Sequence, residues 1–80
     1  DHIVFERILS DLKNTKSPFF SMVLTLTSHE PFDIPVESKF PGKDMETKFL
    51  NSISYTDSAL GDFIDKAKKQ DWWDNTLVIV

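Results

Sequence analysis

The order of apolar patterns along the chain predicts an α/β fold. An amphipathic stretch at 1–14 is followed by an apolar run at 19–27, a second amphipathic stretch at 45–69 and a final apolar run at 76–80. A strand, a crossover helix and a second strand form a βαβ unit with parallel strands and a right-handed crossover. Both apolar runs are nearly continuous, which is typical of strands covered on both faces. We therefore expect a βαβ piece of a larger α/β domain.

The first amphipathic stretch predicts a helix, with Asp1 in a position to cap it. Its apolar residues follow helical spacing: Ile3, Val4, Ile8, Leu9 and Leu12. A polar turn over 14–18 ends the stretch at Pro18, because the residue before a proline disfavours helical geometry. The helix is followed by the first predicted strand, rich in Phe, Val, Leu and Thr, at 19–27.

Residues 28–44 predict a loop, since Pro31, Pro35 and Pro41 interrupt any regular element and Gly42 marks a turn. Connections of this length are uncommon unless they are functional or disordered. The sequence therefore makes this loop a place to look for functional side chains.

The longest predicted element is a helix over 45–69, with Asp44 as its N-cap. Its apolar positions are three or four residues apart: Phe49, Ile53, Thr56, Leu60, Phe63, Ile64 and Ala67. Gly61 costs the helix about 1 kcal/mol relative to alanine, so we expect a close neighbour there. A turn over 70–75, with two tryptophans as a hydrophobic lid, leads into the second predicted strand at 76–80.

Composition narrows the classes of function. Nine basic and 13 acidic residues give a net charge of −4, which has the wrong sign for a nucleic-acid binder. There are no cysteines, so disulfides, cysteine-ligated zinc and cysteine nucleophiles are excluded within the chain. No stretch reaches the roughly 18 consecutive apolar residues of a membrane-spanning helix. The expected domain organisation is a single partial domain over 1–80.

The candidate chemistry follows the first predicted strand. In open α/β sheets, ligands bind at the carboxyl ends of the strands. Ser28, His29 and Glu30 stand at that point, and the predicted strand at 76–80 ends at the same edge. Adjacent residues do not form a catalytic triad merely by being adjacent. His29 is either a ligand-binding imidazole or a loop histidine bonded to backbone, and Glu30 is more consistent with a solvated carboxylate.

Three ordered motifs resemble one protein family. They are SPFF with LTLTSHEPF at 17–20 and 24–32, NSISYTD with LGDFI at 51–57 and 60–64, and WDNTLVIV at 73–80. This pattern resembles the sulfatase-type members of the alkaline phosphatase superfamily. Within it, the sequence is similar to the lipoteichoic acid synthase-like phosphoglycerol transferase branch. The residues Glu30, Pro31 and Phe32 differ from those usual in synthase members, which leaves the substrate open.

The resemblance implies that the chain is part of a larger alkaline-phosphatase-like α/β sandwich. It also implies a parent enzyme at the extracytoplasmic face of the cell membrane. Such enzymes use a divalent metal (manganese, calcium, magnesium or zinc) to hydrolyse or transfer sulfate or phosphate esters, with a phosphatidylglycerol-type lipid among the candidate substrates. The resemblance places the nucleophile and the metal ligands outside residues 1–80. It assigns one residue here, His29, to substrate binding, and it implies that the 80-residue piece is inactive alone.

A second reading is a small non-catalytic α/β interaction module. The residues that follow Val80 in the parent gene would distinguish these two readings, because the resemblance implies an Asp-His-Gly metal motif there. On either reading, the chain has apolar faces that would be covered by other parts of a larger domain. We therefore expect the isolated chain to self-associate.

Overall fold

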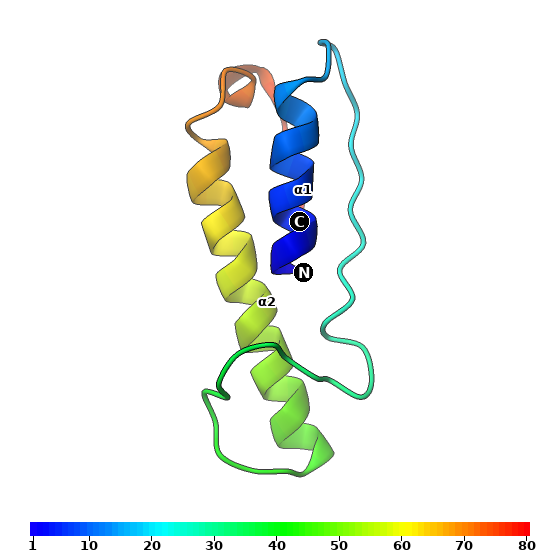
Figure 1. Cartoon of the computed structure of the whole chain (residues 1–80), viewed down its shortest axis with the longest axis vertical. Coiled ribbons are helices and arrows are strands. Elements are labelled where there is room, and N and C mark those ends of the chain that lie inside the picture. Colours follow the sequence, from blue (N-terminus) through cyan, green and yellow to red (C-terminus); the bar gives the residue numbers. More distant parts are fainter.

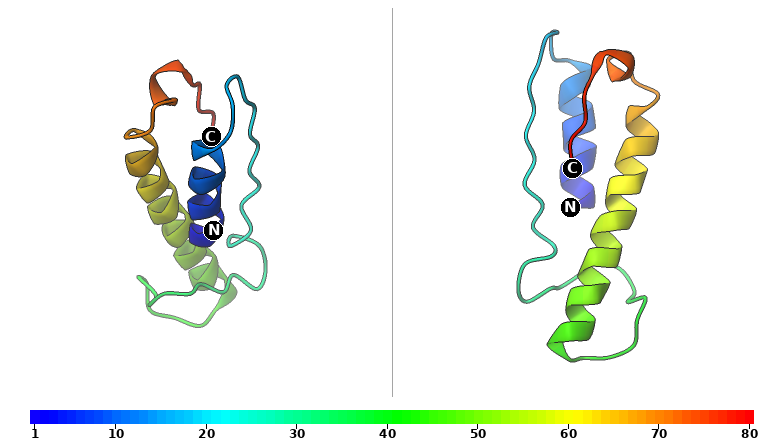
Figure 2. Two further views of the ribbon diagram at one scale, coloured as in Figure 1. Left: turned by 45° about the horizontal axis from the view of Figure 1, so that its top comes forward. Right: turned by 180° about the vertical axis from the view of Figure 1, so that it is seen from behind.

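The computed structural model describes residues 1–80 as a pair of helices with long irregular connections (Figure 1). Helix α1 spans His2–Lys13, helix α2 spans Met45–Ala67, and a short 3₁₀ turn, η1, spans Trp73–Asn75. The two helices lie side by side in an elongated molecule of 45 × 19 × 19 Å. The loop before α2 wraps around the end of that helix, as both views in Figure 2 show.

The predicted strands are absent, so the α/β fold and its βαβ unit are wrong for this structure. Residues 19–26 and 76–80 are extended, yet no backbone hydrogen bond joins one segment to the other. Both run back along α1 rather than pairing (Figures 1 and 2). The physical reason is that a strand is stabilised by its ladder, and two strands without further neighbours rarely form a stable sheet.

The predicted helices are confirmed, and their packing forms the core. Phe5 and Leu9, one turn apart on α1, are buried, and so are Ala59 and Ala67 on α2. The ring of Phe5 packs on that of Phe63 with centroids 5.2 Å apart. This apolar seam is the main contact that holds the two helices together.

An ion pair between Glu6 and Lys66 crosses the edge of the seam. The hydrogen bond from Lys66 lowers the pKa of the Glu6 carboxyl, and the same bond raises the pKa of the Lys66 ammonium. Its contribution is therefore lost as pH falls through the Glu6 pKa or rises through the Lys66 pKa. Because the pair is exposed to water, it adds little to stability.

The start of α2 matches the sequence prediction. The Asp44 carboxylate accepts a hydrogen bond from the Thr47 backbone N–H at 3.0 Å. Hydrogen bonding from the side chain and then the backbone of Thr47 lowers the pKa of the Asp44 carboxyl. Gly61 differs from expectation, since it is exposed and nothing lies within 4 Å of where a Cβ would be. The glycine is therefore not explained by close packing.

The two tryptophans close one end of the helix pair. The Trp72 ring meets Phe19 edge-on, with centroids 5.8 Å apart, and lies 6.5 Å from the Trp73 ring. Both tryptophans are half-buried. Their packing agrees with the predicted hydrophobic lid.

Asp44→Ala should loosen the first turn of α2, while Asp44→Asn should keep it, since asparagine also caps helices well. A lowered carboxyl pKa means that the stabilisation is complete above the unfolded pKa and is lost as pH falls through the folded one. Amide hydrogen exchange at Thr47 should therefore be severalfold faster in Asp44→Ala at neutral pH, and this difference should shrink in acid. A difference independent of pH would contradict the capping role.

The 80-residue chain should self-associate, because its extended segments expose large apolar side chains. Phe20 is 91% exposed, Leu24 92% and Ile79 83%. Exposed apolar runs of this kind promote association. Light scattering should show oligomers in the wild-type chain and fewer in a Leu24→Lys/Ile79→Lys variant. A monodisperse wild-type monomer with a cooperative melt at high temperature would contradict this.

Candidate functional site

His29 lies in a double turn at the end of the extended segment. Its N–H donates to the Leu26 carbonyl at 2.9 Å, and its own carbonyl accepts from the Phe32 N–H at 2.8 Å. The side chain is exposed to solvent. The local prediction therefore holds in part: His29 follows an extended run, but that run is not the edge of a sheet.

The imidazole of His29 contacts its neighbouring backbone. Nδ1 lies 2.8 Å from the carbonyl oxygen of Glu30. A carbonyl oxygen only accepts, so Nδ1 carries the proton in this contact. Nε2 is then the ring atom left for a ligand, and it can donate a hydrogen bond only in the imidazolium form. The backbone contact matches the loop-histidine alternative, and the free Nε2 keeps the ligand-binding alternative open.

Aromatic packing at Phe32 anchors the C-terminal side of the turn that carries His29. Phe32 has a φ of 62°, in the left-handed region. This conformation costs an L-residue about 1–2 kcal/mol. Its ring meets that of Phe49 on α2 edge-on, with centroids 5.1 Å apart, which offsets part of that cost. The turn that carries His29 is thereby fixed to α2 on this side.

The N-terminal side of the turn is anchored by Asp1 and Thr56, for which the sequence predicted a helix cap and a position on the apolar stripe. The Asp1 carboxylate accepts hydrogen bonds from the Leu26 and Thr27 backbone and from the Thr56 hydroxyl. It makes no capping bond to its own helix, so the expected cap role is not fulfilled. One sequence signal could have revealed Thr56: a hydroxyl group on an otherwise apolar helical stripe.

Asn51 holds the long loop, and the sequence predicted no role for it beyond its place in the NSISYTD motif. This side chain is only 4% exposed. Its amide oxygen accepts from the Phe40 N–H at 2.7 Å, and its amide nitrogen donates to the Phe40 carbonyl at 2.9 Å. The pair of bonds satisfies both backbone groups of Phe40 and fixes the loop around Phe40 against α2.

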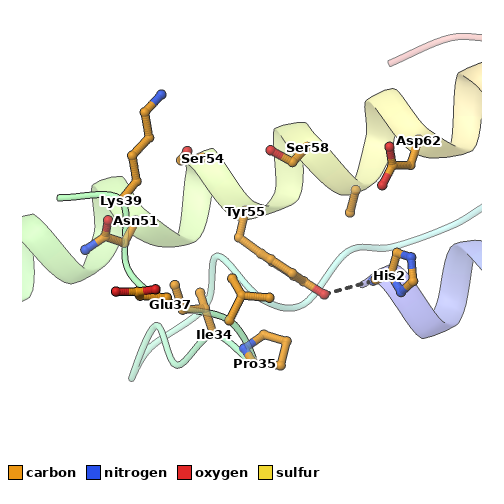
Figure 3. Close-up of a pocket in the computed structure, with 12 residues that line it drawn as sticks. His2, Ile34, Pro35, Glu37, Lys39, Asn51, Ser54, Tyr55, Ser58 and Asp62 are labelled. Atoms are coloured by element: carbon orange, nitrogen blue, oxygen red, sulfur yellow. Dashed lines mark hydrogen bonds between the residues drawn. The ribbon is translucent and has the colours of Figure 1, made fainter.

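A cavity of about 570 Å³ lies between α2, the loop at 34–39 and the first residue of α1 (Figure 3). The Tyr55 side chain reaches across it, and its hydroxyl oxygen accepts a hydrogen bond from the His2 backbone N–H at 3.3 Å. Charges of both signs line the cavity, from Glu37, Lys39 and Asp62. His29 is not among the lining residues, so the candidate residue and this cavity are separate.

The side chains present do not fit a divalent metal. No group of three or more His, Asp or Glu side chains is close enough to hold an ion. His29 and Glu30 offer two donors at most, and Nδ1 of His29 is engaged. None of the helices has the length and apolar character needed to cross a membrane.

The chain belongs to the sulfatase family, because the family model named Sulfatase matches all of residues 1–80. The resemblance stated from its motifs is thus confirmed. No solved structure matches the chain significantly.

Curated relatives point to one branch of the family. The chain is 31% identical over 85 residues to lipoteichoic acid synthase of Staphylococcus aureus (strain USA300), covering 100% of the chain and 13% of that protein. It is 29% identical over 84 residues to lipoteichoic acid synthase-like YvgJ of Bacillus subtilis (strain 168), covering 99% of the chain and 14% of that protein. The chain therefore spans about one seventh of the length of these relatives.

Asn51→Asp should destabilise the protein, because the carboxylate cannot donate to the Phe40 carbonyl. Losing one partner of a buried hydrogen bond typically costs about 1–3 kcal/mol. Urea unfolding should show a loss of that size, and Ser54→Ala, one helical turn away on α2, should stay close to wild type. Equal stability of Asn51→Asp and wild type would show that the Phe40 contact does not hold the loop.

Proposed function

We propose that these residues form part of a longer, extracytoplasmic metal-dependent enzyme that hydrolyses or transfers sulfate or phosphate esters. The family match over the whole chain and the relatives named as lipoteichoic acid synthases support this proposal. The divalent metal and the nucleophile belong to other parts of the parent protein. On this proposal the 80-residue chain alone has no activity.

The observation that carries the proposal is the exposed imidazole of His29 with a free Nε2. Transfer of a phosphoryl or sulfuryl group builds negative charge on the non-bridging oxygens of that group. A donor held in place before the reaction stabilises this charge without reorganisation. With Nδ1–H bonded to the Glu30 carbonyl, His29 offers Nε2–H to such an oxygen as an imidazolium, which an anionic ester stabilises.

The proposed role is substrate binding rather than acid–base catalysis or metal binding. The bond from Nδ1 fixes the ring plane, so Nε2 has a defined direction from the turn. Glu30 is also exposed and forms no ion pair, and no catalytic step is assigned to it. A phosphatidylglycerol-type lipid and simpler sulfate or phosphate esters share the anionic oxygen that His29 would contact.

His29→Ala in the full-length parent protein should lower turnover about 10²- to 10³-fold, the usual cost of removing one oxyanion donor. The assay measures kcat with p-nitrophenyl sulfate, bis(p-nitrophenyl) phosphate and phosphatidylglycerol vesicles. Metal content and melting temperature should remain near wild type, because His29 binds no metal and packs against little.

Glu30→Ala is the matched control. It removes an exposed side chain from the same turn, and its turnover should remain close to wild type. If His29→Ala retains full activity, or if it loses activity together with its metal, the proposed role is wrong.

A further inference from the structure

The carboxylate of Asp1 joins three segments that are far apart in the sequence. Oδ1 accepts a hydrogen bond from the Leu26 N–H at 2.8 Å, and Oδ2 accepts one from the Thr56 hydroxyl at 3.0 Å. The Thr27 N–H lies 3.3 Å from each carboxylate oxygen. The start of α1 is thus tied to the end of the extended segment and to the middle of α2.

The side chain of a residue at the start of a helix ordinarily accepts a hydrogen bond from one of the first N–H groups of that helix, and that of Asp1 does not. Asp1 occupies the N-cap position of α1, yet its side chain accepts nothing from that helix. The first N–H of α1, from His2, donates to the Tyr55 hydroxyl instead. All the protein donors to the Asp1 carboxylate come from the segment that leads to His29 and from Thr56.

The hydroxyl groups beside Asp1 form a directed chain. A carboxylate only accepts, so Thr56 donates to Asp1, and its Oγ1 is left to accept. Ser28 Oγ lies 3.4 Å from that oxygen and is therefore the donor. The order is Ser28 to Thr56 to Asp1, and Ser28 directly precedes His29. Asp1, Thr56 and Ser28 are half-buried, so water competes only partly with these bonds.

A second path reaches His29 through the backbone. Leu26 donates its N–H to Asp1 and accepts the His29 N–H at its carbonyl, at 2.9 Å. Leu26, which accepts the His29 N–H, is therefore bonded to the Asp1 carboxylate directly, and Ser28, which precedes His29, is connected to it through Thr56. Without these bonds, the exposed turn would be fixed on one side only, by Phe32.

We propose that Asp1 and Thr56 are positioning residues for His29. They hold the turn so that Nε2 of His29 meets the anionic ester oxygen at the correct distance. This inference rests on the substrate-binding role proposed for His29. A displacement of about 1 Å caused by a change away from the reacting atoms can lower the rate about 10²-fold.

The test compares Thr56→Val with Thr56→Ser in the full-length protein. Valine keeps the shape and removes the hydroxyl, whereas serine keeps the hydroxyl. With bis(p-nitrophenyl) phosphate, Thr56→Val should lower kcat about 10- to 100-fold with a smaller change in KM. Thr56→Ser should recover most of the loss. Asp1→Asn, which replaces one acceptor oxygen with an amide donor, should lose activity as Thr56→Val does.

Coupling to His29 separates positioning from general stability. The double variant His29→Ala/Thr56→Val should be no slower than His29→Ala alone, because the bonds act only through His29. Thr47→Val, a matched loss of a hydroxyl on the same helix, should leave turnover unchanged. Full activity of both Thr56→Val and Asp1→Asn, additive losses in the double variant, or an equal loss in Thr47→Val would overturn the inference. Full activity of His29→Ala would instead overturn the proposed function itself.

Discussion

The close packing of α1 on α2 is the contact on which the rest of the structure depends. The buried apolar side chains are Phe5 and Leu9 on α1 and Ala59 and Ala67 on α2, and the rings of Phe5 and Phe63 pack across the pair. The approach of the two helices also brings together polar groups at the margin of this core. The Glu6–Lys66 pair and the contact between His2 and Tyr55 both lie along this margin.

The same approach brings Asp1 to Thr56. These residues are separated by 55 positions in the sequence, and only the helix pairing places the carboxylate within 3.0 Å of the hydroxyl. In this position the carboxylate also accepts hydrogen bonds from the backbone N–H groups of Leu26 and Thr27, at the end of the extended segment. The turn that carries His29 is therefore built on the helix pair from one side, and on the Phe32–Phe49 contact from the other.

His29 lies outside the cavity beside Tyr55, and this separation has a physical consequence for function. An anionic ester bound at His29 would meet an exposed turn, while the hollow beside Tyr55 is lined by charges of both signs. A lone imidazole on a turn can orient one oxygen of a substrate, but it offers neither a nucleophile nor a metal. This is why the proposed chemistry assigns those groups to other parts of the parent protein.

The sequence by itself determined the helices and the family. Apolar residues three or four apart, and Asp44 before the long stripe, are local signals, and both helices formed where those signals lie. Short motifs are also local, so the sulfatase resemblance could be read directly and the family match agrees with it. The position of His29 just after an extended run was predictable for the same reason.

Only the tertiary structure decided the rest. The apolar runs at 19–27 and 76–80 have strand-like composition, but a strand needs a partner for its backbone, and here neither run provides one for the other. The partners of Asp1, Thr56 and Asn51 lie in other segments, and no pattern within their own helices specifies such partners. Hydrogen bonds across long stretches of sequence depend on which surfaces meet, and that was settled by the packing of α1 against α2.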